Sequence, residues 1–206
     1  MDIENECAKT FDLGPGRQSQ RVEETSIRFE GNFDASLYGV ALRHAFFQAW
    51  RLDSKLPLWI RQMEGGSGRK YRYLVNNLFE QLSGSRYLEI GSYKGSTLCS
   101  AGFGNILQAT CVDHWQEFGG KKEFEEHTNR LSKVSPGLNL TVIESDFRTI
   151  DFAKIGKFDV FCFDGPHAEI DHYDGLVLAV PALEQEFVLI VDDWNMASVQ
   201  VSLSGS

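Results

Sequence analysis

The sequence predicts a doubly wound α/β fold, in which a mostly parallel sheet carries helices on both faces. From residue 87 onward, short apolar runs with the length of strands alternate with stretches of helical periodicity. The runs lack strict alternation of apolar and polar residues, which is typical of strands covered on both faces. Strands that alternate with helices connect by right-handed crossovers and lie parallel. The five expected strands are residues 87–90, 109–112, 138–143, 158–163 and 187–191.

Helices are expected between these strands and before the first of them. Upstream, apolar residues recur every three or four positions over 35–60 and again over 71–82, where Gly84 should end the helix. The expected helices between strands are residues 96–107, 120–134, 147–154 and 168–183. The stripe expected to be buried in the first upstream helix is Leu37, Val40, Ala41, His44, Phe47 and Trp50. The stripe expected in the last helix is Ile170, Tyr173, Leu176, Val177 and Val180.

Length and charge limit what the chain can be. Its 206 residues fit one domain with a substantial core. The formal net charge of −9 and the lack of a long basic run argue against nucleic-acid and anionic-lipid partners. No apolar stretch reaches the roughly 18 residues that span a bilayer, and the acidic N-terminus is unlike a signal peptide. A soluble cytoplasmic protein is therefore expected.

The cysteines support the same interpretation. Cys7, Cys99, Cys111 and Cys162 show no CxxC spacing, and three of them lie inside apolar runs. We expect small buried hydrophobes in a reducing compartment rather than metal ligands or disulfides.

Two parts are expected along the chain. Residues 1–62 should form a polar N-terminal arm followed by a helical segment. Residues 63–206 should form the domain that holds the sheet and the cofactor site. The glycine-rich break at residues 65–68 lies near their junction.

Acidic residues stand at or just after the end of every expected strand. In a doubly wound sheet, ligands bind beyond the carboxyl ends of the strands. Aspartate is common in turns, so turn chemistry alone would explain some of these residues. Five acidic strand ends out of five favour a binding site instead. The residues are Glu89, Asp113, Asp146, Asp164 and the pair Asp192 and Asp193.

The segment from Glu89 to Gly95 has the pattern of a loop that approaches a ligand closely. Gly91 and Gly95 leave out side chains where backbone must touch a ligand, and the next helix presents N–H groups from its N-terminus. The dinucleotide fingerprint G-x-G-x-x-G is absent, because Ser92 and Tyr93 follow Gly91. This pattern counts against an NAD-linked oxidoreductase.

Residues after the second and third strands suit a nucleoside. Asp113 is placed to accept hydrogen bonds from both ribose hydroxyls. Asp146 and Phe147 could hold an adenine, or Asp146 could simply cap the helix that follows. His114 and Trp115 could wall the adenine pocket, and Trp115 could equally be part of the core.

The stretch Tyr87-Leu88-Glu89-Ile90-Gly91-Ser92-Tyr93-Lys94-Gly95-Ser96-Thr97 resembles motif I of class I methyltransferases, which have a Rossmann-like sheet. The chain is most similar to the metal-dependent O-methyltransferases of the catechol and macrocin types, from about Met63 to Asn195. The resemblance implies S-adenosyl-L-methionine as cofactor. Its methionine amino group, or a bound water, would face Glu89, its ribose would lie on Asp113, and the segment around Met63–Lys70 would close over it. The cofactor-binding residues expected in total are Glu64, Gly65, Glu89, Gly91, Ser92, Tyr93, Gly95, Ser96, Asp113, His114, Asp146, Phe147 and Asp164.

Asp164 and the pair Asp192 and Asp193 predict a metal site. Neighbouring strands lie about 4.8 Å apart, so the two strand ends should bring the acids together. Three carboxylates that close repel one another unless a cation neutralises them. Oxygen donors suit Mg²⁺, Mn²⁺ or Ca²⁺ rather than zinc. The structural alternative is that Asp192 or Asp193 only caps a turn; we expect a divalent cation, with Mg²⁺ first.

His167 is the expected base. It follows Asp164 by three residues, in a Gly-Pro turn. In the resembling catechol enzymes this position is a lysine, and in the macrocin-type enzymes it is a histidine. A histidine near its ordinary pKa can take a proton from a hydroxyl. His44 and His172 have no such placement and are expected to be structural or surface residues.

The expected function is a metal-assisted O-methyltransferase that acts on a hydroxyl of a small molecule or sugar. The chain departs from its relatives at Glu184-Gln185-Glu186, where they carry a glycine turn, and only about a dozen residues follow Asp193, where they add two strands. A non-catalytic cofactor-binding or assembly module is therefore the alternative. A homo-oligomer could cover the open sheet edge, which would otherwise be prone to aggregation.

Overall fold

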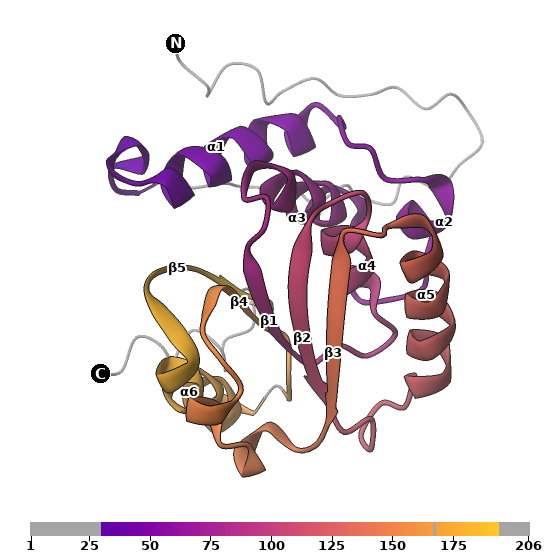
Figure 1. Cartoon of the computed structure of the whole chain (residues 1–206), viewed down its shortest axis with the longest axis vertical. Coiled ribbons are helices and arrows are strands. Elements are labelled where there is room, and N and C mark those ends of the chain that lie inside the picture. The colour runs from indigo at the N-terminus through magenta and orange to yellow at the C-terminus, as the bar shows by residue number, and fades with distance from the viewer. Residues whose placement is uncertain (1–29, 167, 194–206) are drawn as a thin grey trace, which may run out of the picture. The chain divides into compact units, whose positions relative to one another are not determined.

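A five-stranded parallel sheet forms the centre of the molecule (Figure 1). The computed structural model describes residues 30–166 and 168–193, which from Asn32 onward belong to one compact unit. The strand order is β3-β2-β1-β4-β5, and every neighbouring pair is parallel. The predicted doubly wound fold is therefore confirmed. The strands are β1 (Arg86–Ile90), β2 (Leu107–Asp113), β3 (Leu138–Glu144), β4 (Phe158–Phe163) and β5 (Leu183–Val191).

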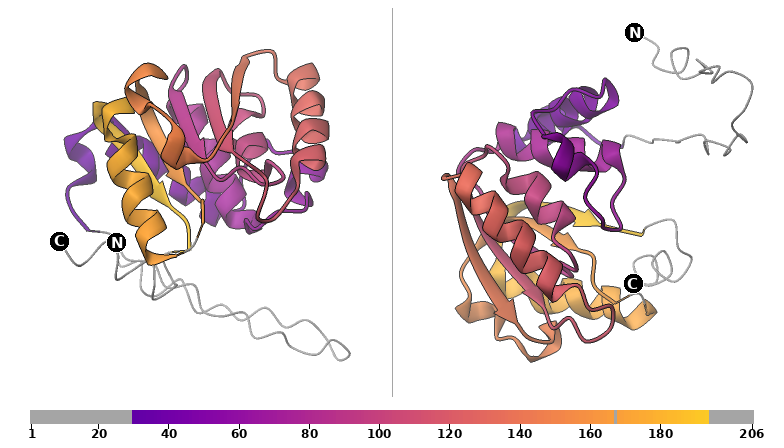
Figure 2. Two further views of the ribbon diagram at one scale, coloured as in Figure 1. Left: turned by 90° about the horizontal axis from the view of Figure 1, so that it is seen from below. Right: turned by 90° about the vertical axis from the view of Figure 1, so that its right-hand side faces the viewer.

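Helices pack on both faces of this sheet, and two turned views show them outside the strands (Figure 2). Because successive strand residues point to opposite faces, Tyr87 joins a core with α3, α4 and α5, whereas Leu88 joins a second core with α6. The helices are α1 (Leu37–Trp50), α2 (Leu58–Arg61), α3 (Arg69–Gln81), α4 (Ser96–Gly102), α5 (Lys121–Val134) and α6 (Glu169–Ala179).

The first upstream helix is shorter than predicted. The sequence pattern runs over residues 35–60, but α1 ends at Trp50 because Leu52 takes a left-handed φ of 58°. Its buried face also differs from the predicted stripe, since Leu37 is 72% exposed and His44 is exposed. Ala41 of the predicted stripe is buried, and together with Ala45 it packs in the core that contains residues of α3. This packing places α1 in the same compact unit as the sheet, and the expected domain boundary after residue 62 stays a prediction.

Two other elements differ from the sequence pattern. The helix expected over 147–154 is a pair of short 3₁₀ turns, Phe147–Thr149 and Phe152–Lys154. The turn expected at residues 184–186 is part of β5, which begins at Leu183. Polar residues are tolerated there because β5 is an edge strand of the described sheet, and solvent hydrates its outer face.

The buried face of α6 differs from the predicted one, although Leu176 of the predicted stripe packs against the core. Ile170 is 59% exposed and Val180, just past the helix, is 61% exposed, whereas His172 is buried against the ring of Phe163. A Cβ added at Gly175 would come within 2.0 Å of the Phe163 ring, so the glycine allows the closest approach to β4. Close backbone packing, rather than the apolar stripe, therefore decides how this helix is oriented.

Two further expectations concern the whole chain. Cys99, Cys111 and Cys162 are free and buried, as predicted, and Cys7 lies outside the described residues. Across the part of the chain that the structure describes, no helix is long and apolar enough to cross a membrane. The cytoplasmic localisation stays a prediction.

Candidate functional site

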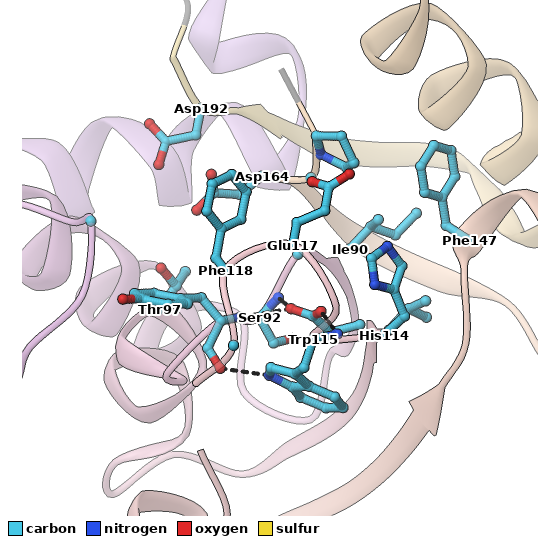
Figure 3. A pocket seen from close by; sticks show the side chains of 18 of the residues that line it. Ile90, Ser92, Thr97, His114, Trp115, Glu117, Phe118, Phe147, Asp164 and Asp192 are labelled. Carbon is cyan, nitrogen blue, oxygen red and sulfur yellow. Dashed lines mark hydrogen bonds between the residues drawn. The ribbon is translucent and has the colours of Figure 1, made fainter. Parts of the chain in front are cut away.

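A cavity of about 380 Å³ lies at the carboxyl ends of β1, β2, β4 and β5 (Figure 3). This is the edge of the sheet at which the sequence predicted a ligand. The predicted site residues that line it are Gly91, Ser92, Tyr93, Ser96, Asp113, His114, Phe147, Asp164, Asp192 and Asp193. Those that do not line it are Glu64, Gly65, Glu89, Gly95 and Asp146.

Gly91 lets the loop after β1 touch the end of β4. Its φ is +88°, and an added Cβ would lie 1.8 Å from the carbonyl oxygen of Asp164. Its N–H donates to the carbonyl of Val112 on β2 at 2.9 Å. Only glycine fits between these two neighbours, so the loop follows a fixed path across three strand ends.

Asp113 organises that loop with its carboxylate. Oδ2 accepts hydrogen bonds from the N–H groups of Ser92 and Tyr93 at 2.9 and 2.8 Å, and Oδ1 accepts one from Trp115 at 2.7 Å. The Trp115 indole in turn donates to the Tyr93 carbonyl at 2.7 Å (Figure 3). A carboxylate offers about four acceptor positions, so about one remains for a ligand. The predicted ribose contact of Asp113 stays a prediction, and its contacts to the loop are an addition that sequence reasoning missed.

Glu89 is buried next to the cavity rather than in its lining. The residue is 1% exposed, and Tyr87 donates a hydrogen bond of 2.6 Å to its Oε2. Its Oε1 has no partner within the described residues. Burial raises the pKa of Glu89 to about 7, and the nearby Asp113 charge adds to the rise, although the Tyr87 bond opposes it. Glu89 can therefore exchange a proton near neutral pH.

The residues that were predicted to surround an adenine line the part of the cavity at the ends of β2 and β3. His114, Trp115 and Phe147 line it together with Ser145, which the sequence did not single out. Asp146 instead caps the turn that follows, since its Oδ1 accepts from the N–H of residue 148 at 2.9 Å. The capping alternative is thus observed for Asp146, and its contact with a base stays a prediction.

The predicted acids meet at the other side of the cavity. Burial, followed by the neighbouring charge of Asp192, raises the pKa of Asp164 to about 8. Asp193 contributes less to that rise, and its N–H donates to Asp192 Oδ1 at 2.9 Å. Within residues 30–166 and 168–193, no group of three acidic, histidine or cysteine side chains is close enough to hold a metal ion. Asp164 and Asp192 are therefore close enough to interact, but among the described residues Asp164, Asp192 and Asp193 do not form the predicted set of three metal ligands. The predicted base, His167, lies outside the described residues.

The segment around residues 63–70 is tied to the loop after β1. Lys94 forms an ion pair of 2.6 Å with Glu64, and the Ser67 and Ser96 hydroxyls are 2.9 Å apart. The Arg72 guanidinium donates to the Ser67 hydroxyl at 2.9 Å. Lys94 and Ser96 lie inside the motif that the sequence singled out, but the sequence pattern did not predict their contacts with Glu64 and Ser67.

The loop between β2 and α5 supplies lining residues that sequence reasoning missed. Glu117, Phe118 and Gly119 all face the cavity. The left-handed φ values of Gly119 and Gly120, +66° and +89°, turn the chain there. The Gly-Gly pair after an aromatic residue was the available signal for a ligand-facing loop.

Comparison with known proteins gives one family and several similar folds. A family model described as a methyltransferase domain matches residues 88–194. The crystal structure of a precorrin 8w decarboxylase from Methanobacterium thermoautotrophicum is 19% identical, with a TM-score of 0.50 over 62% of this chain and 64% of that one. No curated protein matches the chain.

Two methyltransferase structures are similar at lower scores. A SAM-dependent methyltransferase from Thiobacillus denitrificans, bound to S-adenosyl-L-homocysteine, is 16% identical over 66% of this chain and 55% of that one, with a TM-score of 0.49. An O-methyltransferase of tomaymycin synthesis from Streptomyces achromogenes, bound to SAM, is 18% identical over 79% and 74%, with a TM-score of 0.47. The chain thus spans 64% and 55% of the first two structures.

Proposed function

We propose that this chain, which belongs to the family of methyltransferase domains, is an S-adenosyl-L-methionine-dependent O-methyltransferase for a hydroxyl of a small molecule or sugar. One observation carries the proposal. One cavity is lined by Ser92, Tyr93 and Asp113 at the ends of β1 and β2 and by Asp164 and Asp192 at the ends of β4 and β5. A cofactor and an acceptor can therefore meet over the end of β1.

The cofactor belongs in the half of the cavity next to β1 and β2. Asp113 retains about one acceptor position for a ribose hydroxyl, and His114 and Phe147 offer surfaces for an adenine. Glu89, when ionised, would attract the amino group of the methionine part. The positive charge of the cofactor suits an acidic cavity.

Methyl transfer needs a deprotonated oxygen in line with the methyl group. A lone pair of the acceptor oxygen forms the bond to the methyl carbon, the carbon–sulfur bond breaks, and its electron pair stays on sulfur. His167 would take the hydroxyl proton as general base. Positioning of the two reactants and exclusion of water supply most of the rate, because the sulfonium is already activated.

A divalent cation, Mg²⁺ first, is part of the proposal. The donor chemistry fits, because Mg²⁺ keeps several waters and needs only one or two carboxylates, which Asp164 and Asp192 can supply. Their close approach, which raises the pKa of Asp164, supports such a pair. A bound cation would increase the acidity of the acceptor hydroxyl.

A homo-oligomer that covers the edge strand β5 also remains a proposal. Phe187 and Leu189 on β5 are 39% and 43% exposed, which supports a covering partner. Sedimentation of the purified chain tests it: a monomer at all concentrations contradicts the oligomer.

Two measurements test the proposed activity. Calorimetry should show binding of S-adenosyl-L-homocysteine in preference to NAD, and labelled methyl groups should move from the cofactor to hydroxyl acceptors. Chelator should abolish that transfer and leave most of the cofactor affinity. Binding without transfer to any acceptor would select the non-catalytic module, and preference for NAD would select an oxidoreductase. Full activity in chelator would remove the metal.

A further inference from the structure

The cavity has a strong excess of acidic side chains. Its described lining contains no lysine or arginine. The carboxyl groups that line it are Asp113, Glu117, Asp164, Asp192 and Asp193. A divalent cation and the positively charged cofactor would together still leave more carboxylates than positive charges. The acceptor therefore enters a negative field.

Three basic side chains near the cavity are held by acids outside its lining, and the Arg72 guanidinium donates to the Ser67 hydroxyl and the Ile60 carbonyl. Lys94 pairs with Glu64 at 2.6 Å, and Lys121 pairs with Glu144 at 2.6 Å. Arg148, after the cavity residue Phe147, pairs with acids outside the lining. None of these three cations is placed to balance a carboxylate or phosphate group on an acceptor.

The loop between β2 and α5 places an aromatic ring in the same lining as these carboxylates. Phe118 lines the cavity although it is 69% exposed, and Glu117 lies beside it. Figure 3 shows both side chains on the part of the cavity that faces Asp164. An aromatic face beside carboxylates is the arrangement that attracts an organic ammonium group.

The lining also holds a buried polar side chain. Ser92 is 5% exposed and lines the cavity. Its hydroxyl interacts with the buried Glu89 carboxyl and opposes the rise in the pKa of that group. Ser92 therefore adds a polar group to the lining.

We propose that the acceptor carries a protonated amine in addition to its hydroxyl, and that Glu117 and Phe118 bind this ammonium group. The inference rests on the proposed function, because it needs an acceptor in this cavity. Glu117 and Phe118 select the acceptor and take no part in the methyl transfer itself. An acceptor with a carboxylate or phosphate would meet acids without a countercharge in the described lining and should bind more weakly.

Three catechols that differ in charge provide the test: dopamine, 4-ethylcatechol and 3,4-dihydroxyphenylacetate. Their dissociation constants are measured on the full chain with S-adenosyl-L-homocysteine and Mg²⁺ bound. We expect dopamine to bind most tightly and the anion most weakly, with a difference of about tenfold or more, as for one ion pair near a surface. High salt should shrink the difference.

Variants test whether Glu117 and Phe118, in the loop between β2 and α5, cause the tighter binding of dopamine. Glu117→Gln should remove most of the advantage of dopamine, and Phe118→Leu should reduce it. Glu125→Gln, on the exposed face of α5 and outside the cavity, removes the same charge and should leave the order unchanged. Equal or tighter binding of the anion overturns the proposal, as does binding of none of the three or an unchanged order in Glu117→Gln. Failure to bind S-adenosyl-L-homocysteine, measured first, would instead overturn the proposed function.

Discussion

The two halves of the cavity are held together in different ways. Next to β1 and β2, the loop is fixed by hydrogen bonds to Asp113 and by the close approach that Gly91 allows. Next to β4 and β5, Asp164 and Asp192 crowd like charges together. Hydrogen bonds within the chain hold the first half, whereas the second half places two acidic side chains next to each other. A change in the first half should therefore alter folding and cofactor affinity, and one in the second should alter turnover.

The largest effect is expected from a change of the proposed base, His167. His167→Ala should lower the turnover number by about 10²–10⁴-fold, the usual contribution of a positioned base. Affinity for S-adenosyl-L-homocysteine, measured by calorimetry, should not change. The pH–rate profile of the parent should rise near neutrality, and that of the variant should lack this limb. A parental turnover number in the variant would exclude His167 as the base.

Gly91→Ala tests how the loop next to β1 and β2 is held in place by its close contact with the end of β4. The added Cβ would overlap the Asp164 carbonyl, and the φ of +88° is itself unfavourable for alanine. We expect the free energy of unfolding to fall by about 3 kcal/mol or more. Gly66→Ala, also in the lining but with nothing within 4 Å of its added Cβ, should change it by less than about 0.5 kcal/mol. Equal denaturant midpoints for the two variants would contradict this interpretation.

Buried acids make stability depend on pH. Glu89 has a pKa raised from 4.5 to about 7, so the folded state keeps a proton that the unfolded state has lost. Its contribution to stability is complete below pH 4.5 and is lost as pH rises to about 7, on the order of 3 kcal/mol in all. Asp164, with a pKa raised from 3.8 to about 8, acts in the same direction over the wider range between these values.

Denaturant unfolding between pH 4.5 and 8 measures this loss of stability. Glu89→Gln keeps the shape and the Tyr87 contact but cannot ionise, so its stability should vary less with pH. A parent whose stability rises across this range would show that Glu89 is ionised in the folded state.

Asp113→Ala should weaken binding of S-adenosyl-L-homocysteine by about 1.5–3 kcal/mol, the scale of hydrogen bonds to a charged acceptor. Loss of the ribose contact and loss of the bonds to Ser92 and Tyr93 act together. Glu144→Ala removes an acid from the neighbouring strand end, outside the cavity, and is the control. Unchanged calorimetric affinity in the Asp113 variant would remove Asp113 from the site.

The smallest effect concerns the segment around residues 63–70. Cofactor binding should slow tryptic cleavage at Arg69 and Lys70, because ligand contacts would add to the Glu64–Lys94 and Ser67–Ser96 contacts. Equal cleavage rates with and without S-adenosyl-L-homocysteine would mean that the segment does not close over the cofactor.

Sequence reasoning was strongest where a local pattern has one structural outcome. The five strands were found because buried parallel strands are continuous apolar runs. The glycine loop was found because only glycine permits the contact that Gly91 makes. Reasoning failed for α6, whose apolar stripe includes the exposed Ile170. Periodicity of apolar residues indicates an amphipathic helix, but in α6 the close packing of Gly175 on the Phe163 ring decides which face is buried.

The sequence by itself determined the fold class, the edge of the sheet that carries the cavity and about half of the residues that line it. Tertiary structure alone decided that Asp113 holds the loop, that Tyr87 bonds to Glu89, and that Glu117 and Phe118 reach the lining. The physical reason is distance along the chain. Strand and glycine-loop patterns reflect backbone preferences within a few residues, whereas hydrogen bonds and charge crowding depend on which side chains the completed sheet brings together.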